Sequence, residues 1–356
     1  MPDNSTIESD LLNALQGPPL DEGRFGELAL RVFEHQFNHN RSYRAYCEAK
    51  HTTPRCLSTW HDIPAVPTDA FKQTEHPLLS FPAHDIGHTF VTSGTTSELR
   101  GQHHFPTLEL YHQSVLSAWR ELGLPKIGHA VFLIAPPEHA YQSSLSSMMG
   151  VIADKLAAKS TWALDGKSPI SIDAITRAAA EQSPLALFGT ALAFLHFFDS
   201  LDFPVKLPEG SWAMETGGYK GSGRNLRKED LYQKFELKLG LNHKRIINEY
   251  SMTELSSQYY SHGLDSPHTG PSWTRARVID PVTDTDAKPG QAGYLVLYDL
   301  ANLHSCMAIR TQDLAIRVED TKPANNGAGY SFNLLGRDPA ALPRGCSRAA
   351  DYQLSQ

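Results

Sequence analysis

A run of hydroxyl side chains around one glycine has residue types that could bind phosphate. The run reads Thr92-Ser93-Gly94-Thr95-Thr96-Ser97. Hydroxyls and backbone N–H groups donate hydrogen bonds to phosphate oxygens, and glycine lets the backbone come close and turn. Burial without partners would cost about 1–3 kcal/mol for each hydroxyl. The run therefore predicts either a phosphate-binding loop or an ordinary surface loop rich in serine and threonine.

A second polar stretch follows a predicted strand and reads Asn248-Glu249-Tyr250-Ser251-Met252-Thr253-Glu254. Open α/β sheets bind their ligands at the carboxyl ends of strands, so the position is favourable. Glu254 offers a carboxylate, which Mg²⁺ prefers together with phosphate oxygens, and Thr253 could bond a phosphate oxygen. The alternative is the start of a helix, capped by a hydroxyl and followed by acidic residues in its first turn.

Two more segments combine glycine or charge with a strand end. Gly217 and Gly218 lie between a predicted strand and a predicted helix, with Lys220 just after them. Glycines let a flat base or a phosphate reach the backbone, and lysine supplies a point charge. Asp313 lies between short strands, where it could bind ribose hydroxyls or simply cap a turn. Arg337 follows the last predicted strand and could contact a ligand or be merely solvated.

Cys346 has neighbours typical of an exposed turn, with proline, glycine and serine at 343–347. Arg344 and Arg348 would favour its thiolate, which is the nucleophilic form of cysteine. An inert cysteine on a short tail is the alternative. Cys306 lies in a predicted strand instead, and we expect it to face the core.

The elements that would position these residues follow from the spacing of apolar side chains. Helical spacing predicts helices before residue 50 and at 108–122, separated by a proline-rich connector. From residue 130 strands alternate with helices, which predicts a parallel, doubly wound sheet. The predicted strands are 130–135, 185–188, 212–215 and 245–249, and the helices are 141–156, 172–181, 192–201 and 226–239. After Gly263 short strands joined by turns predict an antiparallel subdomain that resembles a small barrel, with strands at 276–279, 294–298, 306–311, 315–318 and 331–335.

Composition excludes several classes of protein. The chain has 356 residues and a formal net charge of −7, which argues against nucleic acid as a main partner. No apolar run is long enough for a membrane span, and the N-terminus lacks the features of a signal peptide. The four cysteines form no CxxC pair and the 17 histidines lack metal-ligand spacing, so we expect a protein of the reducing cytoplasm.

The polar segments, taken in order, resemble the motifs of the adenylate-forming ligases. The segments that carry this resemblance are 93–96, 249–254, Asp313 and Gly336-Arg337. Segments 216–221, 248–255, 299–302 and 343–347 are more specifically similar to the acyl-protein synthetases of LuxE type, also called long-chain-fatty-acid–protein ligases. That family activates fatty acids for the bioluminescence reductase complex, and the phenylacetate–CoA ligases are its nearest relatives. The resemblance runs from about residue 60 to the end.

For the nucleotide, the resemblance implies roles residue by residue. Thr92 to Thr96 would hold the phosphates of ATP, and Gly217 and Gly218 would lie along the adenine. Tyr250 would stack near the adenine, and Asp313 would hold the ribose.

For the reacting groups, the resemblance implies that Thr253 contacts the α-phosphate and that Glu254 binds Mg²⁺. Arg337 would lie at a hinge and contact ribose or phosphate, and Cys346 would take the acyl group. It also implies acyl-pocket residues at His139 and Tyr141 and a carboxylate site near residues 188–190.

Two departures from the superfamily pattern matter. Ser97 replaces a usual glycine, and the loop lacks its usual terminal lysine, with Arg100 as the nearest cation. After the hinge position only residues 338–356 remain, where the superfamily has a mobile domain that carries a lysine for adenylation. We therefore expect Lys220 to replace that lysine in part, because one electrostatic donor in such a site is worth about a hundred- to thousand-fold in rate.

The expected fold is α/β: the large N-terminal domain of an adenylate-forming enzyme, doubly wound and mostly parallel, with a small antiparallel β subdomain and without the mobile C-terminal domain. The expected segments are a helical N-terminal segment and connector (1–85), a nucleotide- and acyl-binding core (86–262), the antiparallel subdomain (263–336) and a short tail (337–356).

The expected activity is ATP-dependent conversion of a carboxylic acid, such as a fatty acid, to acyl-AMP, followed by transfer to a protein thiol. The expected cofactors are ATP and Mg²⁺. The acceptor would be a reductase-type partner protein or CoA, and the protein could be an oligomer. An acyl- or aryl-CoA ligase of the phenylacetate type and a nucleotide-binding subunit without catalysis are the alternatives.

Overall fold

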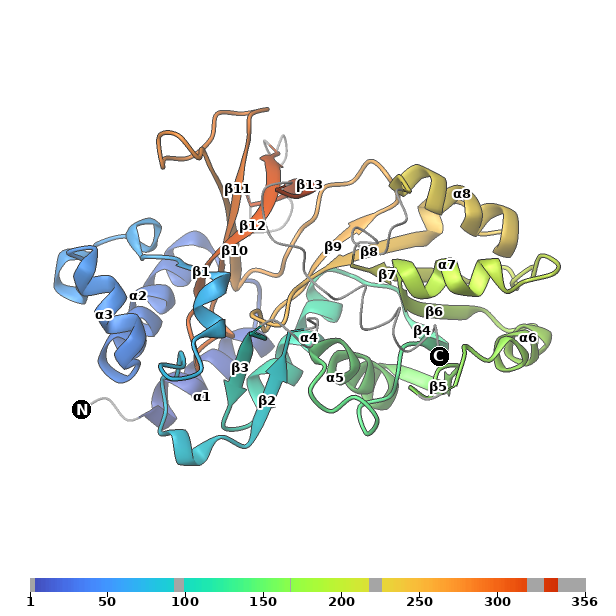
Figure 1. Ribbon diagram of the computed structural model, residues 1–356, viewed down its shortest axis with the longest axis horizontal. Coiled ribbons are helices and arrows are strands. Elements are labelled where there is room, and N and C mark those ends of the chain that lie inside the picture. The colour runs from blue at the N-terminus through green and yellow to red at the C-terminus, as the bar shows by residue number, and fades with distance from the viewer. Residues whose placement is uncertain (1–3, 93–98, 167, 218–225, 319–329, 339–356) are drawn as a thin grey trace.

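A six-stranded sheet forms one half of the molecule in the computed structural model, which describes residues 4–92, 99–166, 168–217, 226–318 and 330–338 (Figure 1). Its strand order is β5-β4-β6-β7-β8-β9, parallel from β5 to β8, with β9 antiparallel at the edge. The strands are β4 (Ile127–Leu133), β5 (Ala157–Trp162), β6 (Leu185–Thr190), β7 (Trp212–Thr216), β8 (Ile246–Tyr250) and β9 (Tyr259–His262). The predicted doubly wound, mostly parallel sheet is present.

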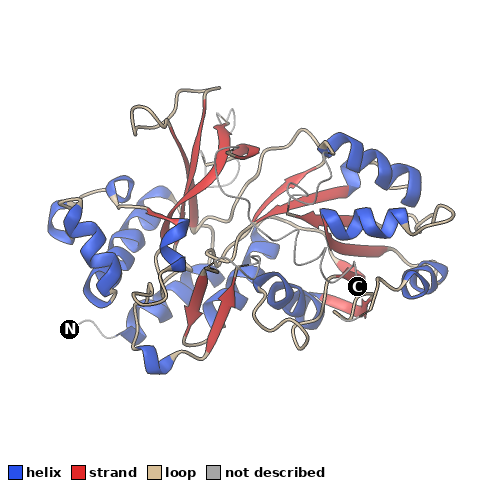
Figure 2. Cartoon of the chain, in the orientation of Figure 1, coloured by secondary structure: helices blue, strands red, loops and turns tan. Residues whose placement is uncertain are grey.

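Helices cover both faces of this sheet, as Figure 2 shows by colour. One face packs on α4 (Glu109–Glu121) and α5 (Ser144–Val151), which continues as a π-helix at Ile152–Leu156. The other packs on α6 (Ile172–Ala180), α7 (Ala191–Asp199) and α8 (Lys228–Leu239). Successive strand residues point to opposite faces, so Leu187 packs toward α6–α8 and Phe188 toward α4.

The second sheet is mostly antiparallel, as predicted. Strands β10 (Thr274–Ile279), β11 (Ala292–Asp299), β12 (Ala308–Arg317) and β13 (Phe332–Arg337) pair in sequence. The two strands predicted at 306–311 and 315–318 are one strand, β12, whose register with β11 shifts at a bulge. The short β1 (Val66–Pro67) adds a parallel edge to β12, which no sequence pattern indicated.

The N-terminal segment is helical, as predicted, with α1 (Asn4–Gln16), α2 (Glu22–His39) and α3 (Arg41–Ala49). Short 3₁₀ turns follow at Pro54–Cys56, Trp60–Asp62, Thr68–Lys72 and Ala83–Asp85. Buried residues of these helices share one hydrophobic core with the second sheet and with one face of the first. The division into four segments stays a prediction. Among the described residues, no helix is long and apolar enough to cross a membrane.

A hairpin, β2 (His88–Val91) and β3 (Gln102–Phe105), carries the hydroxyl-rich run between its strands. The sequence did not indicate this hairpin, because its strands are short and contain three histidines. The edge strand β5 was missed for a similar reason: its polar residues do not form the apolar run of a central strand.

Candidate active site

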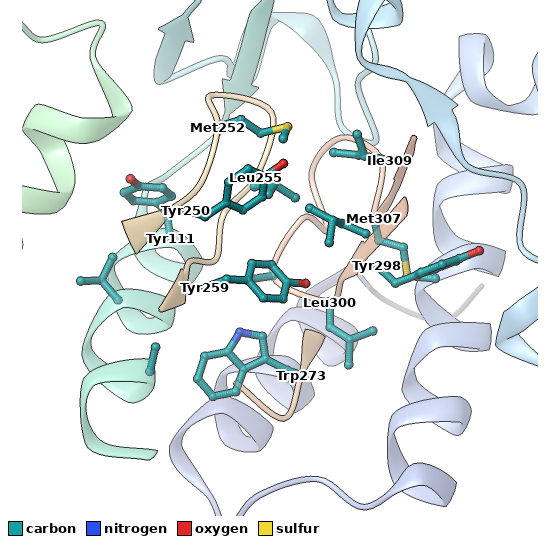
Figure 3. Close-up of a cluster of buried hydrophobic side chains, with 14 of the residues drawn as sticks. Tyr111, Tyr250, Met252, Leu255, Tyr259, Trp273, Tyr298, Leu300, Met307 and Ile309 are labelled. Carbon is teal, nitrogen blue, oxygen red and sulfur yellow. The ribbon is translucent and has the colours of Figure 1, made fainter. Parts of the chain in front are cut away.

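Thr253 and Glu254 lie in a tight connection between β8 and β9, and not at the start of a helix. Both are buried, and the Leu255 amide donates to the carbonyl of Met252 at 3.0 Å. Met252 and Leu255 flank the pair and pack into a hydrophobic cluster with Leu300 and Met307 (Figure 3). The helix-start alternative is therefore wrong, since these apolar anchors hold the segment in an irregular turn that leads to a strand.

Two buried side chains hold the backbone of this turn. His103 Nδ1 lies 2.9 Å from the carbonyl oxygen of Thr253, and Asn302 Nδ2 donates to the carbonyl of Glu254 at 2.8 Å. A carbonyl can only accept, so His103 carries its proton on Nδ1 and Nε2 accepts from the Ser305 hydroxyl at 2.7 Å. Burial lowers the pKa of His103 to about 3, which keeps the ring neutral.

Asp299 fixes the residues that follow Glu254. Its carboxylate accepts from the amides of Ser256 and Ser257 at 3.0 and 2.8 Å and from the Ser257 hydroxyl at 2.8 Å. It also accepts from the Ala301 amide at 3.0 Å. Burial raises the pKa of Asp299 to about 6, while these hydrogen bonds act against the shift. The segment 299–302 resembles the acyl-protein synthetases in sequence, but the resemblance implied no role for it. In the structure it supports the turn at 253–254.

The base of the hydroxyl-rich run is closed by hydrogen bonds. The Thr92 amide donates to the Gly101 carbonyl, and the Gly101 amide donates to the Thr92 hydroxyl, both at 2.8 Å. A Cβ at Gly101 would lie 3.0 Å from Thr92 Cγ2, so a glycine suits this close approach. Ser93, Gly94, Thr95 and Thr96 lie outside the described residues.

Tyr250 connects the first sheet to the second. Its hydroxyl donates to Asp313 Oδ2 at 2.8 Å, and its ring packs edge-on against Phe332. Asp313 faces Arg337 in the β12–β13 register, and Arg337 in turn donates to the side chain of Gln312. Three residues predicted to contact the nucleotide therefore lie side by side.

Gly217 follows β7 with a φ of +74°, a conformation that favours glycine. No atom of the described residues lies within 4 Å of the position a Cβ would take there, so these residues leave space for a ligand beside the backbone. The preceding Thr216 donates its hydroxyl to the buried carboxylate of Glu249. Gly218, Lys220 and Cys346 lie outside the described residues.

The described candidates form one connected set. Thr216, the last residue of β7, contacts Glu249 on β8. The turn at 253–254 is joined to the hairpin through His103, and Tyr250 is joined to Asp313. His139 and Tyr141 are exposed, and Phe188 is part of the core. His103, Asp299 and Asn302 were given no role from the sequence. Asp299 and Asn302 belong to a segment that resembles the acyl-protein synthetases, whereas His103 has no signal of its own.

The charge arrangement suits Mg²⁺ only together with a phosphate. Within the described ranges no group of three or more His, Cys, Asp or Glu side chains could hold a metal ion. Mg²⁺ commonly uses one or two carboxylates and completes its shell with water and substrate phosphate. Glu254, buried beside the hairpin that carries the hydroxyl-rich run, fits that requirement as a single carboxylate ligand.

A family model described as acyl-protein synthetase, LuxE, matches residues 21–355 of the chain. No curated protein matches this chain. The fold is similar to an open conformation of 2-hydroxyisobutyryl-CoA ligase in complex with 2-HIB-AMP and CoA, with a TM-score of 0.65 and 16% identity over 92% of this chain and 78% of that chain.

Two further solved structures have a similar fold. The postadenylation state of that ligase with 2-HIB-AMP has a TM-score of 0.64 and 16% identity, over 90% of this chain and 69% of that chain. The ATP-bound RpMatB-BxBclM chimera B3 has a TM-score of 0.51 and 17% identity, over 84% and 58%. At these identities the likeness concerns the fold.

Proposed function

Because the chain belongs to the acyl-protein synthetase family of LuxE type, a family of ligases that form acyl adenylates, we propose that it activates a carboxylic acid with ATP and passes the acyl group to a protein thiol. A fatty acid is the proposed substrate, and a reductase-type protein is the proposed final acceptor.

One observation carries the proposal: residues far apart in the chain converge at the carboxyl ends of β7 and β8. Tyr250 forms a hydrogen bond with Asp313, 63 residues later in the sequence. His103 forms one with the carbonyl of Thr253, 150 residues later. These contacts join the segments proposed for adenine, ribose, phosphate and metal. Open α/β sheets bind their ligands at the carboxyl ends of strands, so this convergence supports a nucleotide site there.

In the proposed first step, a carboxylate oxygen of the acid attacks the α-phosphorus of ATP. A new P–O bond forms, the bond to the bridging oxygen of the β-phosphate breaks, and pyrophosphate leaves. Thr253 would donate to the α-phosphate, Asp313 would hold the ribose, and Arg337 would contact ribose or phosphate. His103 and Asn302 fix the backbone at 253–254 in advance, which lowers the reorganisation that the reaction requires.

Mg²⁺, held by Glu254 and phosphate oxygens, would supply positive charge against the triphosphate. Lys220 is proposed to contribute a second positive charge there, in place of the lysine that the superfamily carries on its mobile domain.

In the proposed second step, the Cys346 thiolate attacks the carbonyl carbon of the acyl adenylate. The thiol proton goes to solvent, a thioester forms, the C–O bond to AMP breaks, and AMP leaves. Transfer from this thioester to a second protein thiol is the same exchange with a new thiolate.

Carboxylate-dependent exchange of labelled pyrophosphate into ATP tests the first step. We expect exchange with fatty acids, and a loss of about a hundred-fold or more in Glu254→Gln, because that change removes the single carboxylate proposed for the metal. Glu229→Gln makes the same chemical change at an exposed position of α8 and should exchange normally. Lys220→Ala should lose about a hundred-fold as well.

No exchange across fatty, aromatic and small polar acids would contradict the enzyme proposal and favour a nucleotide-binding subunit without catalysis. An unchanged exchange rate in Lys220→Ala would exclude the role of that lysine.

A CoA ligase is the second candidate, and the fold shared with a ligase whose solved structure contains CoA and an acyl adenylate favours it. Incubation with ATP and radiolabelled acid, without CoA, separates the two. Self-acylation predicts label on the protein that Cys346→Ser abolishes and that Cys56→Ser, at an exposed free cysteine, leaves intact. Label released only as acyl-CoA once CoA is added would support the ligase.

A further inference from the structure

Three polar side chains form a row across the carboxyl ends of β7 and β8 and the amino end of the antiparallel β9. Thr216 is paired with Glu249 across β7 and β8, and Glu249 is paired with Tyr260 across β8 and β9. Residues directly opposite each other on neighbouring strands point to the same face of a sheet. The row lies on the face covered by α4, since Glu249 and Tyr260 both interact electrostatically with Tyr111 of that helix.

Two atoms of this row lack partners among the described residues. Glu249 is 1% exposed and Tyr260 is 3% exposed, yet Glu249 Oε1 and the Tyr260 hydroxyl have no hydrogen-bond partner there. A buried polar atom without a hydrogen-bond partner is unfavourable, because it has lost its contacts with water. Glu215, on the other face of the sheet, is also buried but does have hydrogen-bond partners. Its carboxylate accepts from Tyr232 at 3.0 Å and from Asn248 at 2.7 Å.

The electrostatics of the pair suit a neutral polar partner. Burial raises the pKa of Glu249 to about 7, and the hydroxyls of Ser251 and Thr216 oppose this shift. The hydrogen bonds that oppose the shift of Glu249 thus come from hydroxyl groups. Burial also raises the pKa of Tyr260, so its phenol keeps its proton and can donate. One hydroxyl group could donate to Glu249 and accept from Tyr260 at the same time.

The surroundings combine this polar pair with apolar side chains. Phe188, Met214 and Ile247 occupy the same face two residues earlier along their strands, which is about 6–7 Å away. Glu249 is also adjacent in sequence to Tyr250 and is bonded to Thr216, which precedes Gly217. The pair therefore belongs to the same strand ends as the proposed nucleotide contacts.

We propose that Glu249 and Tyr260 bind a hydroxyl group on the carboxylic acid, so that the preferred substrate is a hydroxy acid and not its unsubstituted fatty counterpart. This inference rests on the proposed function, because it names a subsite beside the reacting carboxylate. A site that must hydrogen-bond a substrate hydroxyl discriminates strongly against the analogue that lacks it, since the buried groups of the protein are then unpaired.

The test compares pyrophosphate exchange with butanoate, octanoate and dodecanoate and with their α-hydroxy and β-hydroxy derivatives. For the wild type, we expect kcat/KM to be at least about tenfold higher for a hydroxy acid than for the unsubstituted acid of the same length. Tyr260→Phe removes only a hydroxyl that has no partner in the described part of the chain, so it should fold normally and lose most of this preference. Glu249→Met should lose it as well.

Tyr232→Phe is the matched control, because this tyrosine bonds Glu215 on the other face of the same sheet. It should lose some stability and keep the preference. Equal use of hydroxylated and unsubstituted acids by the wild type, or a preference that survives in Tyr260→Phe, would overturn the inference. So would a preference for the amino acid of the same carbon skeleton.

A binding measurement separates this inference from the proposed function. Absence of exchange with every acid would contradict the proposed function. Calorimetric titration with the same acids would then test whether Glu249 and Tyr260 bind a hydroxyl group. Tighter binding of a hydroxy acid that weakens about tenfold in Tyr260→Phe would support the inference alone, and equal binding of both acids would overturn it.

Discussion

Glu215 and Glu249 are neighbouring carboxylates that burial affects alike but whose partners differ. Burial raises the pKa of each to about 7. Glu215 has its hydrogen bonds from Tyr232 and Asn248 and lies on the face of α8, so it stabilises the sheet. Glu249 lies on the face of α4 and keeps one oxygen without a partner among the described residues. The same residue type thus serves structure on one face and, as we propose, substrate recognition on the other.

Glu215→Gln should change how the stability of the protein depends on pH. The folded pKa of Glu215 is raised above its ordinary value of 4.5 to about 7, so the folded state binds this proton more tightly than the unfolded state. That stabilisation is complete below pH 4.5 and is lost as the pH rises to 7. The free energy of unfolding of the wild type, relative to Glu215→Gln, should therefore fall by about 1–3 kcal/mol between pH 5 and 8.

Urea unfolding of both proteins at intervals across this range measures that difference. Asp230→Asn, at a carboxylate whose pKa is lowered by its contact with Arg227, is the control and should show no fall over the same range. A difference between wild type and Glu215→Gln that stays constant with pH would show that Glu215 ionises as freely in the folded protein as in the unfolded one.

At the residue level, the sequence indicated the groups that could contact a ligand, but it did not indicate the groups that hold them. Thr253, Glu254 and Asp313 carry side chains whose chemistry is visible by type and order. The role of His103 depends on a carbonyl 150 residues away, and its neighbours Gln102 and His104 form no local pattern that reveals such a partner. Glu249 was visible within its motif, but the lack of a partner for its Oε1 among the described residues follows only from the packing of three adjacent strands.

At the level of elements, periodicity was informative where an element buries a continuous apolar face. Helices α2, α4 and α8 and strands β4 and β6 have such faces, and their positions agree with the sequence. The hairpin β2–β3 and the edge strands β1 and β5 were missed, because their stability comes from pairing with distant strands or from a few buried side chains. The hairpin matters most for function, since it carries the hydroxyl-rich run.

The docking of this hairpin should depend on His103, which is its hydrogen-bonded link to the turn at 253–254. His103→Ala leaves the Thr253 carbonyl and the Ser305 hydroxyl unpaired and opens a cavity. We expect a loss of about 2–5 kcal/mol in the free energy of unfolding, measured with urea. Pyrophosphate exchange, measured where the variant is still folded, should fall as well, because the hairpin and the turn would no longer be fixed together.

His84→Ala is the control for this prediction, since the His84 side chain is 83% exposed and should be removable without effect. A His103→Ala protein of wild-type stability would mean that the hairpin is held by its apolar contacts alone, such as the packing of Phe90 on Phe105 and Tyr111.

At the level of the whole molecule, the two sheets form a single arrangement because polar and apolar contacts cross between them. Tyr250 and Tyr259 of the first sheet pack against Phe332 of the second. Asp299 of the second sheet accepts a hydrogen bond from the backbone of Ser257, in the connection that follows β8. The order of the motifs along the chain was enough to predict the family and the α/β fold. It could not predict that the second sheet would hold the turn at 253–254, which follows only from the packing of the two sheets.

Tyr250→Phe should therefore weaken nucleotide binding more than it weakens the fold. The change removes one hydrogen bond, to Asp313, and leaves the ring in its aromatic cluster, so the free energy of unfolding should fall by only about 0.5–1.5 kcal/mol. Asp313 would lose the contact that orients its carboxylate toward the proposed ribose position. Calorimetric titration with ATP should then show a dissociation constant raised about three- to thirtyfold, which is a loss of about 0.7–2 kcal/mol in binding free energy at 1.4 kcal/mol for each factor of ten. Tyr259→Phe, in the same cluster but with its hydroxyl directed to the Arg275 carbonyl at 3.5 Å, should bind ATP as the wild type does. Equal ATP affinity in the wild type and Tyr250→Phe would contradict the proposed role of the Tyr250–Asp313 contact in nucleotide binding. The contact would then have a purely structural role between the sheets.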